Sequence, residues 1–176
     1  MLLANNIVLV VAMAAVLLGT LYPLVLDTLD LGKISVGPPY FDAVFLPLMA
    51  PALFLMAVGP LARWKNTPVP ELVHRLRWAF VVAVVVSLLL PLTVDGFRPM
   101  TSLGLWFALW IAGGVVVAVL GMLRGHDGRL SLRRAKLHAA SAWGMHLAHL
   151  GVAVFIVGVT LVNSYTVDRE QRAQPG

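Results

Sequence analysis

The chain has 176 residues, of which 60% are hydrophobic and only 12% are charged, and its mean hydropathy is +0.89. A soluble domain carries about 25% charged residues, so this composition excludes an ordinary soluble protein and indicates an integral membrane protein. The formal charge of +5 would also suit a nucleic-acid-binding protein, but the basic residues lie in short segments between apolar runs, so we expect no nucleic-acid partner.

Five apolar stretches are long enough to form transmembrane helices, which need about 20 residues each. In chain order they cover residues 2–22, 43–62, 78–94, 103–123 and 143–162. We expect the first to end at Pro23, and the early turns of the second to be kinked or irregular at Pro47 and Pro51. The sequence therefore predicts an all-α fold: a polytopic membrane bundle of five transmembrane helices that forms a single domain over residues 1–176.

The basic residues predict how these helices are oriented. Most of the 13 lysines and arginines lie in the segments that follow the second and fourth stretches, namely Arg63, Lys65, Arg75, Arg77, Arg124, Arg129, Arg133, Arg134 and Lys136. The positive-inside rule places both segments in the cytoplasm. We therefore expect the N-terminus on the cytoplasmic side of the membrane and the C-terminus on its outer, periplasmic side.

The outer segment between the first two stretches contains Gly37 followed by Pro38 and Pro39. These residues cannot continue a helix, and we interpret them as an interfacial turn. The alternative is a lip that lies on the outer face beside a cofactor or a substrate.

The last apolar stretch, from Trp143 to Val162, carries two histidines. An ionisable side chain at membrane depth is costly and is by default a candidate functional residue, and imidazole is a common ligand of haem iron. His149 is the stronger candidate because it lies about 9 Å past Trp143 along the helix axis; its alternative role is to donate a hydrogen bond to a carbonyl or a neighbouring helix. His146 could ligate or form a hydrogen bond, but we expect it to reach the membrane interface.

Gly144, Gly151 and Gly158 recur at every seventh position of the same stretch. At about 100° per residue they form one face, the glycine face, which points away from His149. Small residues in register allow another backbone to approach closely in lipid. We therefore expect the glycine face to pack against another helix, although chance spacing of a common residue would give the same pattern.

The histidines do not provide two axial ligands for one haem. Such ligands approach the ring from opposite sides, whereas His146 and His149 share one face of a helix. The other four stretches contain no histidine, and the chain has no cysteine for a thiolate site. The remaining histidines, for which we expect solvated or headgroup-level side chains, are His74, His126 and His138. A second axial ligand would come from another chain or from a longer form of this one.

Several sequence blocks resemble CcmF, the haem-lyase family of the bacterial cytochrome c maturation system. They are M-L-L-A-N-N-I-V-L-V at residues 1–10, L-G-T-L-Y-P-L at 18–24, G-K-I-S-V-G-P-P-Y-F at 32–41, V-G-P-L-A-R-W at 58–64, W-G-M-H-L-A-H-L-G at 143–151 and G-V-A-V-F-I-V-G-V at 151–159. The blocks are spread over nearly the whole chain. The resemblance implies a multi-pass protein of the bacterial inner membrane, with a periplasmic C-terminus, that helps to attach haem to apocytochrome c.

The resemblance also implies a cofactor and protein partners, and it implies that the chain is only part of the lyase. The cofactor is haem b, for which His149 in the A-H-L-G block is an axial ligand, whereas His146 has no assigned role and remains a weak candidate. The implied partners are the remainder of the CcmF-like lyase, a CcmH-type thiol subunit, the haem-loaded chaperone CcmE and apocytochrome c. The tryptophan-rich segment and the periplasmic domain of the family have no counterpart in these residues. We therefore expect a fragment or a split-gene product that is not an active enzyme by itself.

Two other functions remain open. In a transporter or channel segment, His149 would be a proton-relay group with further polar residues at membrane depth, where the sequence offers little beyond Ser87 and Thr160. In a structural membrane scaffold, His149 would serve only as a hydrogen-bond donor and no haem would bind.

Overall fold

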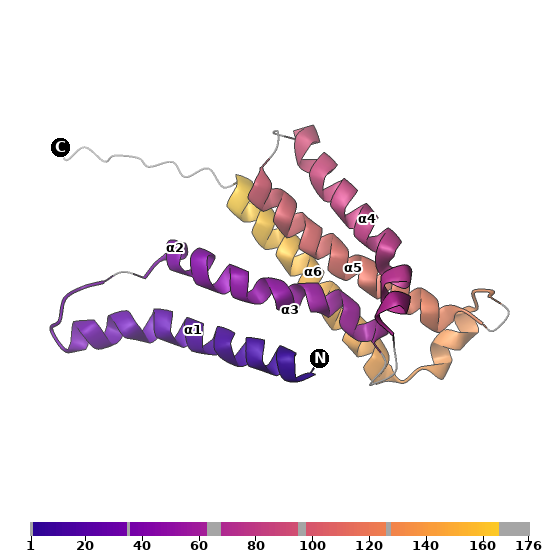
Figure 1. Cartoon of the computed structure of the whole chain (residues 1–176), viewed down its shortest axis with the longest axis horizontal. Coiled ribbons are helices and arrows are strands. Elements are labelled where there is room, and N and C mark those ends of the chain that lie inside the picture. The colour runs from indigo at the N-terminus through magenta and orange to yellow at the C-terminus, as the bar shows by residue number, and fades with distance from the viewer. Residues whose placement is uncertain (1, 35, 63–67, 95–97, 126–127, 166–176) are drawn as a thin grey trace, which may run out of the picture. The chain divides into compact units, whose positions relative to one another are not determined.

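The computed structural model describes residues 2–34, 36–62, 68–94, 98–125 and 128–165, and within these residues it is helical without strands (Figure 1). Five of its helical segments are long and apolar enough to cross a membrane, namely Asn5–Thr28, Phe41–Leu61, Val69–Thr93, Pro99–Leu123 and Ala140–Ser164. The prediction of an all-α fold with five segments long and apolar enough to span a membrane is confirmed for the described residues. The chain divides into two compact units, residues 1–56 and 57–176.

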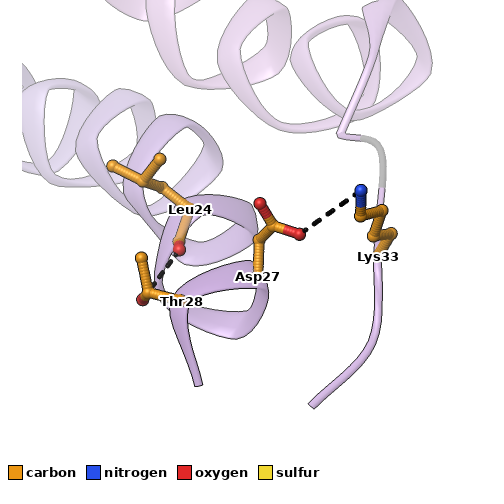
Figure 2. Close-up of polar contacts among 4 residues, drawn as sticks. All are labelled: Leu24, Asp27, Thr28 and Lys33. Atoms are coloured by element: carbon orange, nitrogen blue, oxygen red, sulfur yellow. Dashed lines mark hydrogen bonds and ion pairs between the residues drawn. The ribbon is translucent and has the colours of Figure 1, made fainter. Parts of the chain in front are cut away.

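The first unit begins with α1 (Leu2–Thr28), which continues through Pro23 instead of ending there as predicted. A proline removes one backbone hydrogen bond, but in lipid a helix is the conformation that pairs the other backbone groups internally, so prolines are tolerated inside membrane helices. The end of α1 is shown in Figure 2: the Thr28 hydroxyl donates to the Leu24 carbonyl at 3.0 Å, and Lys33 returns to lie 3.8 Å from the Asp27 carboxylate. This ion pair is exposed, so it contributes little to stability.

The next helix starts earlier than predicted. The short helix α2 (Pro38–Tyr40) continues into the π-helix η1 (Phe41–Phe45) and then into α3 (Leu46–Val58). Instead of an interfacial turn at Gly37–Pro38–Pro39, Pro38 opens the helix, where its missing N–H would have no partner in any case. The π-helix just before Pro47 agrees with the predicted irregularity of the early turns.

Tyr40 fastens this segment to α1 within the first unit. Its hydroxyl donates to the Ala15 carbonyl at 3.0 Å. Its ring covers Gly19, where an added Cβ would lie 2.5 Å from the Tyr40 Cε1 atom. A glycine at position 19 is therefore required for this close approach, a role that the L-G-T-L-Y-P-L block does not reveal by itself.

The second unit is built around α5 (Pro99–Leu123), which packs against α4 (Val69–Val94) and against α6 (Ala140–Tyr165) (Figure 1). The 3-10 helix η2 (Gly59–Leu61) follows α3, and the 3-10 helix η3 (Leu132–Leu137) lies between α5 and α6. Helix α4 begins nine residues before the predicted boundary at Trp78. Arg75 and Arg77 are thus helical and not in a loop, and the Glu71 carboxylate pairs with Arg75 one turn later, at 2.5 Å.

Two adjacent glycines allow α5 to approach two other elements. A Cβ added at Gly113 would lie 3.0 Å from the Cβ of Ala79 on α4, and one added at Gly114 would lie 2.6 Å from the carbonyl oxygen of Ala57 near the end of α3. Around these contacts lies a core of buried side chains: Ala57, Leu76, Ala83 and Trp110. The close packing of backbones at small residues is the usual way in which helices associate in lipid.

Candidate functional site

Helix α6 packs against α5 along a row of residues spaced seven apart. His146 and Ala153 are 5% and 4% exposed, and Thr160 lies against Gly104 of α5, where an added Cβ would be 2.9 Å from the Thr160 Cγ2 atom. Because seven residues make nearly two turns, these positions form one face. The contact with α5 therefore fixes the rotation of α6 about its axis, and with it the direction in which each histidine points.

His146 lies inside this helix pair. Its Nε2 atom is 3.2 Å from the sulfur of Met122 on α5, and its Nδ1 atom is buried without a hydrogen-bond partner among the described residues. Our expectation that His146 reaches the membrane interface is therefore wrong. A thioether sulfur is a weak acceptor, so His146 is held mainly by packing.

His149 lies one turn further along α6 and is partly exposed. Its Nδ1 atom is 2.8 Å from the backbone carbonyl oxygen of Met145. A carbonyl only accepts, so Nδ1 carries the proton, and in the neutral ring Nε2 then keeps its lone pair. Histidines that bind metals usually have this arrangement, in which the second ring nitrogen donates to a carbonyl. The hydrogen bond proposed as the alternative role of His149 is present, and it is compatible with ligation through Nε2.

Polar contacts join the N-terminal end of α5 to the C-terminal end of α6. The Thr101 and Ser164 hydroxyl oxygens are 2.6 Å apart, and Thr101 is buried. Arg98, which precedes α5, donates a hydrogen bond to the Ser164 carbonyl, where a cation also complements the negative end of the α6 dipole. These contacts, together with the packing of Thr160 against Gly104, hold the C-terminal end of α6, the helix that carries both histidines near its start.

We predict that Thr101→Val lowers the stability of this helix pair by about 1 kcal/mol, since interhelical hydrogen bonds in membranes are typically worth about that or less. The matched control is Thr93→Val, because the Thr93 hydroxyl donates to the Leu90 carbonyl of its own helix at 2.7 Å. The measurement is the unfolding free energy of the purified chain in detergent. Equal losses in the two variants would show that the contact between Thr101 and Ser164 does not hold the helices together.

The glycine face of α6 is exposed and has no neighbour in the described part of the chain. A Cβ added at Gly144, Gly151 or Gly158 would meet nothing within 4 Å. Within these residues, α6 uses the opposite face to pack against α5. The packing of the glycine face against another helix therefore stays a prediction.

The other histidines do not join His149. His74 lies on α4 with an exposed side chain, and His126 is outside the described residues. The Nε2 atom of His138 is 3.1 Å from the Met122 carbonyl, so Met122 contacts one histidine through its backbone and another through its sulfur. Sequence reasoning missed this role of Met122, because neither its spacing nor its type marks it. The described residues also contain no group of three or more histidine or carboxylate side chains that could hold a metal ion.

Comparison with known proteins shows which curated proteins the chain is similar to. No family model matches the chain, and no solved structure matches it. Among curated proteins, the cytochrome c-type biogenesis protein CcmF of Escherichia coli K12 is 44% identical over 177 residues, and that of Pseudomonas fluorescens is 42% identical over 176 residues. The cytochrome c-type biogenesis protein CycK of Rhizobium meliloti is 32% identical over 179 residues.

These matches cover 99–100% of the chain but only 26% of each relative. The chain thus spans about a quarter of the length of the curated relatives that it matches. The matched region covers both compact units and the helix with the two histidines. Over its full length, the chain is therefore similar to about a quarter of the cytochrome c-type biogenesis protein CcmF.

Proposed function

We propose that this chain takes part in cytochrome c maturation as the segment of a haem lyase that provides one axial histidine, His149, to a haem b in the membrane. The relatives named for cytochrome c biogenesis support the pathway. The observation that carries the ligand assignment is the contact between Nδ1 of His149 and the Met145 carbonyl at 2.8 Å, because it leaves Nε2 as the ligating nitrogen and fixes the ring.

The two histidines of α6 differ in how accessible their Nε2 atoms are to a cofactor. His149 is partly exposed, so a cofactor can approach its Nε2 atom, whereas His146 is buried and its Nε2 atom faces the Met122 sulfur. When bound, haem b supplies a one-electron redox centre whose potential depends on its axial ligands and surroundings. The second axial ligand would come from outside these residues.

The membrane and the partners that we propose for the chain follow from its resemblance to CcmF. The chain would lie in the bacterial inner membrane with its N-terminus in the cytoplasm and its C-terminus in the periplasm, as the basic residues predict. There it would act with the remainder of the lyase, a CcmH-type thiol subunit, the haem-loaded chaperone CcmE and apocytochrome c. The glycine face would pack α6 against the remainder of the lyase.

A proton relay through His149 receives no support, since the Ser87 hydroxyl donates to the Val84 carbonyl of its own helix and Thr160 packs on Gly104.

The test is an absorbance spectrum of the chain together with the remainder of a matching CcmF protein, purified from the membrane in detergent. We expect the wild-type assembly to show the reduced spectrum of haem b, and His149→Ala to lose it while the assembly still forms. An unchanged haem spectrum in His149→Ala would refute the ligand assignment. An assembly that forms without haem in the wild type would favour the structural scaffold.

A further inference from the structure

The described part of the segment that joins α5 to α6, residues 124–125 and 128–139, has an ordered backbone held by hydrogen bonds. Its backbone returns on itself through hydrogen bonds from Gly125 N to Arg129 O at 2.9 Å and from Ser131 N to Leu123 O at 3.0 Å. It then forms η3, and the indole Nε1 of Trp143 donates to the Ala135 carbonyl at 3.1 Å. The leucine–arginine segment, residues 129–137, is thus tied to both helices.

This segment exposes apolar side chains to an unusual degree. Leu132 and Leu137 are 83% and 78% exposed, the two most exposed of the large apolar side chains in the described part of the chain, and Leu130 is 61% exposed. The candidate membrane spans on either side end at Leu123 and begin at Ala140. The three leucines thus lie in the short segment between two candidate membrane spans, and apolar side chains that border a span can enter the acyl region.

The same segment is basic. Arg133 and Lys136 are exposed and have no protein partner among the described residues, and with three residues per turn they lie on one side of η3. The Arg134 guanidinium, by contrast, donates to the Arg124 carbonyl and helps to hold the segment. From Arg124 to Lys136 the sequence has five basic residues and one acidic residue, Asp127, so the segment complements a negatively charged surface.

We propose that the leucine–arginine segment lies in the membrane interface, with Leu130, Leu132 and Leu137 among the acyl chains and Arg133 and Lys136 bound to the headgroups of anionic phospholipids. Exposed leucines beside lysine and arginine are the composition of segments that lie in the plane of a membrane surface, and basic residues next to transmembrane helices attract anionic lipids. A protein partner would gain the same charge contacts, but the leucines at the membrane boundary favour lipid. Through the bond between Trp143 and Ala135, the segment would anchor the start of α6.

The charge contacts are tested by native mass spectrometry of the purified chain, titrated with phosphatidylglycerol or with phosphatidylcholine of the same acyl chains. We expect tighter binding of phosphatidylglycerol, and a fall in this preference of about five-fold for each charge removed in R133Q/K136Q. R133K/K136R is the matched control, because it exchanges the two side chains without changing the charge, and it should keep the preference.

The leucine contacts are tested separately with nitroxide labels, since the chain contains no cysteine. In bilayers that contain phosphatidylglycerol, a label at Leu137→Cys should be accessible to oxygen, and one at the adjacent Lys136→Cys should be accessible to a water-soluble nickel chelate. Equal affinity of the wild type for both lipids, or equal accessibility of both labels to the nickel chelate, would overturn the proposal. Displacement of phosphatidylglycerol by inorganic phosphate, beyond that caused by sodium chloride of the same ionic strength, would instead indicate a free-anion site and would also overturn it.

Discussion

Gly114→Leu is expected to lower the unfolding free energy of the chain by about 3 kcal/mol or more, the upper part of the usual range for overpacked cores. Even the first carbon of the new side chain would lie 2.6 Å from the Ala57 carbonyl oxygen and 2.9 Å from the Ala57 Cα atom. These are backbone atoms, so a rotamer change cannot relieve the clash, and α5 must move away from the end of α3. Gly114→Ala should already be destabilising, by about 1–3 kcal/mol.

The control for this prediction is Gly121→Leu on the same helix. A Cβ added at Gly121 meets nothing within 4 Å, so this variant makes the same chemical change without the clash. The measurement is thermal unfolding of the purified variants in detergent, followed by circular dichroism. If Gly114→Leu and Gly121→Leu unfold at the same temperature, the contact between α5 and Ala57 is not part of the folded core.

His149→Gly is expected to abolish haem b in the assembly described above and to recover it in part when imidazole is added. The substitution removes the ring and leaves room for a free imidazole to take the place of the Nε2 atom. The measurement is the reduced-minus-oxidised absorbance spectrum before and after the addition of imidazole. Recovery distinguishes a ligand from a residue whose loss only disturbs the fold, because a misfolded site would not be restored by a small molecule.

His146→Gly is the matched control for this second prediction. It removes the same ring one turn away, from a position that is 5% exposed and next to the Met122 sulfur. We expect this variant to be less stable, because a buried side chain is lost, but to keep its haem spectrum. Loss of haem in His146→Gly and its retention in His149→Gly would reverse the roles that we assign to the two histidines.

The helix boundaries show where sequence patterns stop being informative. Apolar stretches locate the part of a helix that lies in lipid, but they do not record how far the helix extends beyond it. Helix α4 begins at Val69 instead of Trp78, and its first turns contain Arg75, whose pairing with Glu71 supports a helix outside the apolar stretch. The prolines were misread for a related reason: a proline disfavours an interior helical position, yet Pro23 lies within α1 and Pro38 opens α2.

The sequence by itself predicted the all-α class, the five helices long and apolar enough to span a membrane, and the resemblance to CcmF. Each of these follows from local composition or from short motifs, because lipid makes length and hydrophobicity decisive for a helix. Only the tertiary structure decided which face of α6 meets α5, that His146 is buried against Met122, and that the glycines of the glycine face have no neighbour among the described residues. Helix packing depends on residues far apart in the chain, such as Gly104 with Thr160 and Gly114 with Ala57, and their pairing leaves no periodic signal in either helix alone.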